Sequence, residues 1–253
     1  MSLRPLLILQ TGNPPKAVSA THGGFDAMVQ AQAGLAPERT AVVKVYAGET
    51  LADPATYAAA IITGSPANVT DRDAWSLETA EWLRRAVAAD LPVLGICYGH
   101  QLMAEALGGQ VDFNPAGRET GTQQVERTPE AAHDPLAAAL PTTFPAHFIH
   151  EQSVLTPPPG AVILARNGHD AHQMLRFAPH AWGVQFHPEF DAPIMRTYVD
   201  VMGERLADEG ADVPALARSV ADTEAATAVL RAFVAAYGRE PALADSAESN
   251  DAR

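Results

Sequence analysis

The stretch LPVLGICYGHQLMAEALGG (residues 91–109) decides the fold, because it joins a buried strand directly to a helix. Residues 91–97 form an apolar run with the length of a core strand, and the segment after it has helical apolar spacing and closes at Gly108 and Gly109. Cys97, the only cysteine among 253 residues, lies at the junction. The pattern predicts an α/β unit with a cysteine at its strand-to-helix turn.

The segment GICYG (95–99) has the form Gly-x-nucleophile-x-Gly, which is the arrangement of a nucleophile elbow with cysteine in place of serine. The glycines permit a sharp turn and a close approach of helix and strand. The first N–H groups of the helix then point at Cys97 and favour a thiolate, and the N–H of Tyr98 is placed to donate to an oxyanion. A cysteine that merely fills the core is the alternative, and the two glycines count against it.

A second motif, GVQFHPEF (183–190), supplies a base for the thiol. His187 follows a predicted buried strand, and Glu189 lies two residues further, on the same side of an extended chain. Glu189 can hold the imidazole in one tautomer while the other ring nitrogen serves Cys97. Taken alone, a strand-end histidine beside a surface carboxylate is an equally good interpretation, and the elbow is what favours a catalytic one.

The first half of the chain alternates strands with helices, and the second half is rich in short strands. Strands are predicted over 5–12, 40–49, 57–66, 91–97, 121–128, 146–154, 161–167, 171–177 and 181–187, and helices over 24–33, 74–90, 99–109, 192–208 and 222–237. We therefore expect an α/β fold with a mostly parallel central sheet flanked by helices and a smaller antiparallel portion. One domain over 1–240, with C-terminal helices at about 192–237, and a disordered tail over 241–253 complete the expected organisation.

The composition excludes several classes of protein. A net charge of −13 with a pI near 5.0 argues against a nucleic-acid-binding protein or one that binds an anionic membrane surface. The first apolar run, Leu6 to Leu9, is too short for a signal peptide, and no segment has the length of a membrane span. We expect a cytoplasmic protein without disulfides.

The histidines and tryptophans suggest two further sites that the spacing does not favour. Trp75 and Trp82 are seven residues apart on a predicted helix, where they serve either the core or the face of a homodimer, and the core is favoured. Five histidines fall across several predicted strands without ligand-type spacing, so we predict no metal site. These are His147, His150, His169, His172 and His180.

GICYGHQ, followed about ninety residues later by HPE, resembles the class I glutamine amidotransferase family. The resemblance spans about residues 5–200 and includes IITGSP (61–66), which is similar to the family's Gly-Gly-Pro oxyanion loop. It implies the flavodoxin-like fold of that family and a cysteine-dependent hydrolysis of the glutamine side-chain amide. The reaction would pass through a γ-glutamyl thioester, give glutamate and ammonia, and need no metal or organic cofactor.

The resemblance also implies roles for individual residues. Cys97 is similar in position to the nucleophile, His187 to the general base and Glu189 to the acid that orients the base. The implied oxyanion hole consists of the N–H of Tyr98 and a backbone N–H of the Gly64–Ser65 turn. The implied substrate-binding residues are Gln101, through its side chain, and His150, Gln152 and Ser153, through the backbone of residues 150–154.

Two positions depart from the family pattern. Ser65 replaces a glycine that many members have, so a non-glycine residue must adopt the turn or flip through it. Gln152 stands where guanylate-forming members usually show an aspartate, which affects recognition of the substrate amine or the choice of partner.

Three modes of action are open at this point. About fifty residues follow the region of resemblance, which ends near residue 200, and the sequence contains neither a Ser-Gly-Gly-x-x-Ser pyrophosphatase loop nor a GxxxxGK(S/T) phosphate loop. Either a separate synthetase chain accepts the ammonia, or the protein works alone on γ-glutamyl peptides or amines. A catalytically silent regulatory subunit is the third mode, and the intact Cys-His-Glu set argues against it.

Overall fold

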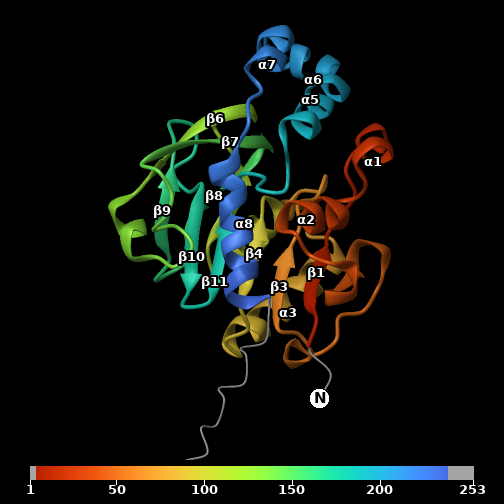
Figure 1. Ribbon diagram of the computed structural model, residues 1–253, viewed down its shortest axis with the longest axis vertical. Helices are drawn as coiled ribbons and strands as arrows, with labels where there is room; N and C mark the ends of the chain where they lie inside the picture. Colours follow the sequence, from red (N-terminus) through yellow and green to blue (C-terminus); the bar gives the residue numbers. More distant parts are fainter. Residues whose placement is uncertain (1–3, 239–253) are drawn as a thin grey trace, which may run out of the picture.

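The computed structural model describes residues 4–238, so the tail predicted over 241–253 lies outside the described residues (Figure 1). The strands are β1 (Leu6–Gln10), β2 (Thr40–Lys44), β3 (Ala59–Ile62), β4 (Val93–Ile96), β5 (Gln110–Phe113), β6 (Glu119–Arg127), β7 (Thr143–His150), β8 (Gln152–Thr156), β9 (Val162–Arg166), β10 (Met174–Ala178) and β11 (Ala181–Val184). The α-helices are α1 (Lys16–His22), α2 (Phe25–Ala33), α3 (Ala74–Ala88), α4 (Tyr98–Ala106), α5 (Ala192–Val201), α6 (Gly203–Asp208), α7 (Val213–Ser219) and α8 (Glu224–Tyr237).

Nine of the strands form one mixed sheet in the order β2-β1-β3-β4-β11-β10-β9-β6-β7, and β5 pairs with β8 in a small second sheet. The pairs from β2 to β11 are all parallel, and those from β11 to β7 are all antiparallel. The expected α/β fold, with a parallel sheet flanked by helices and an antiparallel extension, is confirmed.

The parallel strands are buried on both faces, which explains their continuous apolar runs. In β1, Leu6 and Ile8 pack into one core, and Leu7 and Leu9 pack into the other, as the period of two along a strand requires. Side chains of α2 and α8 complete the first core, and those of α3 and α4 complete the second. Figure 1 shows α8 running along the sheet on the first of these faces.

A third apolar cluster lies beyond the carboxyl ends of the parallel strands. It joins Val18 of α1 and Phe25 of α2 to Met195 and Tyr198 of α5, with Phe190 between them. This cluster brings α5 to the edge of the sheet where β3, β4 and β11 end. In open α/β sheets, ligands bind at this edge.

Several predicted elements differ from the structure. The helix expected over 192–208 is two helices that meet at Met202, and the strand run 146–154 is divided at Glu151 between β7 and β8, which belong to different sheets. Three short elements, α1, α7 and β5, were not predicted. The helices α1 and α7 have only seven residues each, and β5 carries a mostly exposed polar pattern, so the apolar periodicity that reveals an element is weak in them.

Trp82 is a core residue. It is 2% exposed, and its Nε1 donates to the carbonyl of Ala52. Trp75 packs on the ring of Tyr98 with centroids 5.5 Å apart. The core interpretation of Trp82 is confirmed, so a dimer face built on both tryptophans is wrong, although a homodimer through another surface stays a prediction. In the part of the chain that is described, no helix combines the length and the apolar character needed to cross a bilayer.

Candidate active site

Cys97 lies between β4 and α4 in a strained backbone conformation, with φ 49° and ψ −100°. An ideal Cβ on Gly95 would lie 2.5 Å from the backbone of Gly99, and one on Gly99 would lie 2.6 Å from the carbonyl oxygen of Ile62. Neither position admits a side chain unless the backbone moves. The two glycines therefore allow α4 to approach β3 and β4, with its first N–H groups at the thiol-bearing residue.

His187 follows β11, and two neighbours fix its imidazole. Its Nδ1 lies 2.8 Å from Glu189 Oε1, and its ring stacks on Phe190 with centroids 4.2 Å apart. Nε2 has no hydrogen-bond partner among residues 4–238. His187 and Cys97 line the same cavity of about 360 Å³. Because the carboxylate occupies Nδ1, Nε2 is the ring nitrogen available for chemistry in that cavity.

The surroundings of His187 favour its protonated form. Burial lowers the pKa of His187, but the interactions with Glu189 and with Cys97 outweigh burial and raise that pKa to about 10. The neighbouring His147 makes the contrast clear. Its Nδ1 contacts the Thr122 hydroxyl rather than a carboxylate, and burial together with the charge of His187 lowers the pKa of His147 to about 4. The adjacent carboxylate thus distinguishes the two buried imidazoles.

Gly64, just after β3, lies close to both His187 and Cys97. An ideal Cβ on this residue would lie 3.0 Å from His187 Cε1 and 3.7 Å from Cys97 Cβ. Residues that follow β3, β4 and β11 therefore lie close together. Position 64 needs a glycine because the His187 imidazole leaves no room for a side chain there.

Replacing Gly64 by alanine should displace the His187 ring and slow a reaction at Cys97 about tenfold to hundredfold, because a small misplacement of a reacting group is costly. Steady-state kinetics check this against Gly203→Ala as a control, since a Cβ there meets only an ordinary contact 3.7 Å away at Val213. Equal rates for the two variants would contradict a tight passage at Gly64.

Ser65 adopts the turn without a positive φ, which is the first of the two alternatives expected for a non-glycine residue at this position. The described non-glycine residues with positive φ are Arg72, Asp90 and Cys97. The Ser65 hydroxyl donates to the carbonyl of Thr11 at 2.8 Å and accepts from the N–H of Ala67 at 3.1 Å. Of the three residues predicted to supply the oxyanion N–H groups, Tyr98 and Ser65 line the cavity with Cys97, and Gly64 does not. A serine therefore fits this turn through its own hydrogen bonds.

Of the four predicted substrate-binding residues, Gln101, His150 and Gln152 line the catalytic cavity and Ser153 does not. The Nε2 of Gln101 donates to the carbonyl of Gln152 and to Gln185 Oε1, at 2.6 and 3.0 Å, so its amide is held at the cavity wall. The Ser153 hydroxyl accepts from Asn114 Nδ2 outside this cavity, so a contact of Ser153 with substrate through its backbone stays a prediction. Ser153 lies in β8, where alternate side chains face opposite sides of the strand.

Gln152 and His150 support the cavity rather than present free polar groups to it. The Gln152 side chain accepts from the N–H of Val69 and donates to the Thr70 hydroxyl, which holds the loop after Pro66 in place. The ring nitrogens of His150 lie 2.9 Å from the carbonyl of Gln152 and 3.0 Å from Glu119 Oε2. The side chains of Gln152 and His150 therefore have no free hydrogen-bonding group to offer a substrate. A predicted contact with substrate would have to use the backbone of these residues.

A comparison with known families decides the relationship. The family model described as glutamine amidotransferase class-I matches residues 25–198. The chain belongs to the class I glutamine amidotransferase family. The resemblance drawn from the sequence motifs is thereby confirmed.

Curated members of the amidotransferase family resemble this chain over about half its length. A glutamine-hydrolyzing GMP synthase of Thermomicrobium roseum is 41% identical over 130 residues, which are 51% of this chain and 23% of that protein. One chain of a glutamine-hydrolyzing GMP synthase of Methanopyrus kandleri, named as a subunit, is 32% identical over 57% of this chain and 75% of its own length. A glutamine amidotransferase-like protein of Gibberella zeae is 32% identical over 68% of this chain and 72% of its own. The chain thus matches only about a quarter of the full-length GMP synthase of Thermomicrobium roseum.

Solved amidotransferase structures share the fold over nearly the whole chain. A glutamine amidotransferase of Thermotoga maritima superposes with a TM-score of 0.74 at 17% identity, covering 94% of this chain and 99% of that one. A glutamine amido transferase of Methylobacillus flagellatus gives 0.73 at 24% identity, with 96% and 98% covered.

Another part of the cavity wall was not predicted. It comes from α5 and the start of α6, through Tyr198, Val201, Met202 and Arg205, and from Arg118 before β6. Motif reasoning missed these residues because they belong to no pattern and reach Cys97 only through the tertiary fold. The single sequence signal was the apolar spacing of 192–208.

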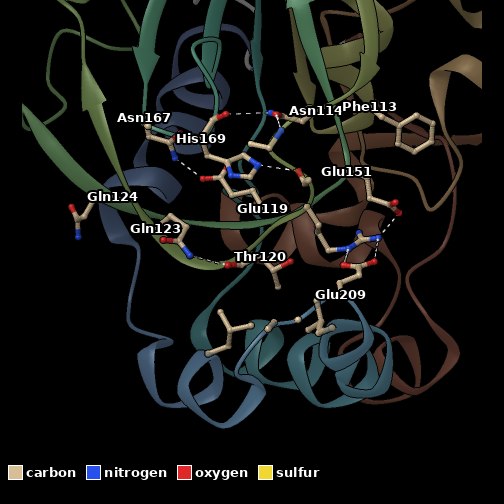
Figure 2. Close-up of a pocket in the computed structure, with 18 residues that line it drawn as sticks. Phe113, Asn114, Glu119, Thr120, Gln123, Gln124, Glu151, Asn167, His169 and Glu209 are labelled. Carbon is tan, nitrogen blue, oxygen red and sulfur yellow. Dashed lines mark hydrogen bonds and ion pairs between the residues drawn. The ribbon is translucent and has the colours of Figure 1, made fainter.

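Four charged side chains form a ring at one end of the catalytic cavity. Arg118, whose side chain is only 8% exposed, pairs with Glu151 and lies 2.8 Å from Glu209. Arg205 pairs with the same two acids, at 2.6 and 3.0 Å. Figure 2 shows Glu151 and Glu209 beside a second, larger cavity of about 1030 Å³. Arg118 and Glu151 line both cavities, so the ring is the wall between them.

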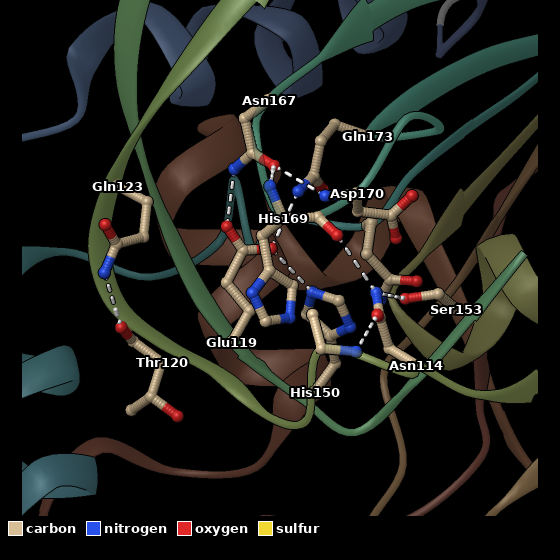
Figure 3. A network of polar contacts seen from close by, with 12 residues as sticks. Asn114, Glu119, Thr120, Gln123, His150, Ser153, Asn167, His169, Asp170 and Gln173 are labelled. Atoms are coloured by element: carbon tan, nitrogen blue, oxygen red, sulfur yellow. Dashed lines mark hydrogen bonds and ion pairs between the residues drawn. The ribbon is translucent and has the colours of Figure 1, made fainter. Parts of the chain in front are cut away.

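A buried carboxylate, Glu119, lines the larger cavity and lies at the centre of a network of polar contacts (Figure 3). Glu119 contacts His150 at 3.0 Å and accepts from Asn167 and Gln173 at 2.5 and 2.7 Å. Burial opposes ionisation of Glu119, but the hydrogen bond and charge of His150 and the two amide hydrogen bonds hold its pKa below the usual value. His150 thereby connects this network to the catalytic cavity. Among residues 4–238 no group of three or more His, Cys, Asp or Glu side chains has the arrangement of a metal site.

Proposed function

We propose that this chain hydrolyses the side-chain amide of glutamine, or a related γ-glutamyl amide, through a γ-glutamyl thioester on Cys97. The observation that carries the proposal is the shared cavity of Cys97, at a strained turn on a helix N-terminus, and His187, whose ring is fixed by Glu189. Nucleophile, proton carrier and orienting carboxylate are the elements of thiol acyl transfer.

In the proposed reaction, the Cys97 sulfur attacks the amide carbon, and the carbonyl π electrons move to oxygen. The N–H groups of Tyr98 and Ser65 stabilise that oxyanion. Collapse of the tetrahedral intermediate breaks the C–N bond, and His187 gives its Nε2 proton to the leaving ammonia or amine. His187 then takes a proton from water, which attacks the thioester and releases glutamate and the thiolate. Glu189 holds the imidazole throughout.

The acceptor of the ammonia is proposed from the relatives. Since one relative is named as a subunit of a GMP synthase, a separate synthetase chain is one candidate partner for this chain. In that mode the chain would act as a glutaminase that is fully active only in complex with its synthetase.

A second candidate is a stand-alone hydrolase for γ-glutamyl peptides or amines, and the adjoining cavities favour it. The catalytic cavity, about 360 Å³, is bounded on one side by apolar residues of α5 and on another by the charged ring, beyond which lies about 1030 Å³ of further space. A leaving group larger than ammonia needs such space next to the scissile bond.

Glutamate release by the purified chain distinguishes these functions, with Cys97→Ala as the blank. We expect turnover of glutamine or of at least one γ-glutamyl peptide or amine by the chain alone. A γ-glutamyl peptide turned over faster than glutamine indicates the stand-alone hydrolase, and slow turnover of glutamine only indicates a glutaminase that awaits its synthetase. No release from any substrate, despite alkylation of Cys97, would refute catalysis by the free chain and favour either a glutaminase that requires its partner or the silent regulatory subunit.

A further inference from the structure

Two buried threonines join the chain segments that follow β1 and β3. Thr11 and Thr63 are both 0% exposed. The Thr11 N–H donates to the Thr63 hydroxyl at 3.1 Å, and the Thr11 hydroxyl lies 3.0 Å from the Thr63 carbonyl oxygen. The segments also touch further on, because an ideal Cβ on Gly12 would lie 2.6 Å from Pro66 Cδ. The turn after β3 is therefore tied to the end of β1.

Both threonine hydroxyls reach one acceptor, the carbonyl oxygen of Gly64. The distances are 2.9 Å from Thr11 Oγ1 and 3.0 Å from Thr63 Oγ1. A carbonyl oxygen accepts two hydrogen bonds with its two lone pairs. The Gly64 carbonyl is thus held on the side of the peptide plane where the threonines lie.

The orientation of this carbonyl fixes the next N–H. The described residues contain no cis peptide bond, and in a planar trans peptide the N–H points opposite to the C=O. The N–H of Ser65 therefore points away from the two hydroxyls. Ser65 lines the cavity with Cys97, whereas Gly64 does not, so the side away from the threonines is the side of the thiol.

We infer that Thr11 and Thr63 are positioning residues that hold the Gly64–Ser65 peptide with its N–H toward Cys97, so that the oxyanion donor is in place before substrate or a partner binds. This inference rests on the proposed function, because it concerns the oxyanion of that reaction. It favours a chain that is active without a partner.

Rotation of the Gly64–Ser65 peptide is opposed from both ends. A flipped carbonyl would lose two hydroxyl donors in a site closed to water, and buried polar groups without partners are unfavourable. The Ser65 hydroxyl, which donates to the Thr11 carbonyl, ties the following residue to the same segment. The serine that departs from the family's glycine thus contributes to the same restraint.

The test compares wild type with Thr11→Val, Thr63→Val and the double variant, with Thr11→Ser to restore a hydroxyl. We expect the double variant to lose about 100-fold in kcat for glutamine or the preferred γ-glutamyl amide, the size expected for one oxyanion donor. KM should change little. Alkylation of Cys97 by iodoacetamide, which develops no oxyanion, should keep its rate. Thr11→Ser, which keeps a hydroxyl at this position, should retain most of the wild-type activity.

Thr128→Val is the matched control, because it removes a buried hydroxyl bond to the carbonyl of Ile163 at 2.7 Å, away from the catalytic cavity. An unchanged kcat in the double variant, or a parallel fall of kcat and alkylation rate, would overturn the inference. Crystal structures of wild type and the double variant provide a readout that does not depend on activity. A wild-type Gly64 carbonyl that faces Cys97 would overturn the inference even if the chain hydrolyses no amide, whereas inactivity of wild type refutes only the proposed function.

Discussion

Replacement of Cys97 by alanine is expected to reduce glutamate release to the background rate, a loss of about 10⁶-fold for a nucleophile that acts as part of a triad. The thiol is the single sulfur nucleophile of the chain, and it lies in the cavity with His187. The fold should persist, because alanine keeps the Cβ at this position and removes only one sulfur atom. Substrate binding should also persist, since the cavity walls are unchanged.

Glutamate release, thermal denaturation and labelling by a γ-glutamyl-directed electrophile are the three measurements. The wild type should be labelled at Cys97, and the variant should show no label with a melting temperature within a few degrees of wild type. Cys97→Ser separates the effect of the thiol's chemistry from the effect of its size. Serine has a similar size but carries a hydroxyl, which is less acidic than a thiol. Persistent hydrolysis by Cys97→Ala would end the thioester mechanism.

Removal of His187 by alanine is expected to cost nearly as much as removal of Cys97, and Glu189→Gln should cost about 10⁴-fold in kcat, by analogy with other triads. In the proposed reaction the imidazole transfers the protons in both half-reactions, so its loss would disable both. Glutamine at 189 still reaches Nδ1, but it lacks the charge that stabilises the imidazolium.

The pH dependence of kcat/KM tests the role of Glu189. A residue with a merely structural role would not shift this dependence. Glu189 is one of the interactions that raise the pKa of His187 to about 10. The protonated imidazole is needed to release the amine, and it is lost as the pH rises through that pKa. In Glu189→Gln the pKa of His187 falls, so the alkaline limb of kcat/KM should move to lower pH. An unshifted limb, or equal losses in His187→Ala and Glu189→Gln, would contradict the orienting and charge-stabilising role.

The parallel half of the sheet was predictable because burial on both faces forces apolar runs. Ile61 and Leu94 pack into the core under α8, and Ile62 and Val93, their neighbours along the chain, pack into the core under α3. The antiparallel half was less predictable. The division of 146–154 at Glu151 depends on which sheet each strand joins. The sequence of a strand does not show which other strand it pairs with.

The chemical centre was predictable for a different reason. Cys97, His187 and Glu189 lie within short motifs whose spacing already fixes local geometry. Arg118 and Met202 were not predictable, since they reach the cavity through the packing of β6 and α5 rather than through a motif. Substrate roles assigned to β8 were the weakest prediction, because the two faces of that strand meet different surroundings.

The helices that close the cavity follow the acid of the catalytic set almost immediately. Asp191, two residues after Glu189, begins α5 by accepting from the N–H of Ile194. The groups proposed to react therefore lie at strand ends, and part of the cavity wall lies in the adjacent helical segment over residues 192–208. Under the proposed function, substitutions in that helical segment would change which amide the cavity admits and would leave Cys97, His187 and Glu189 in place.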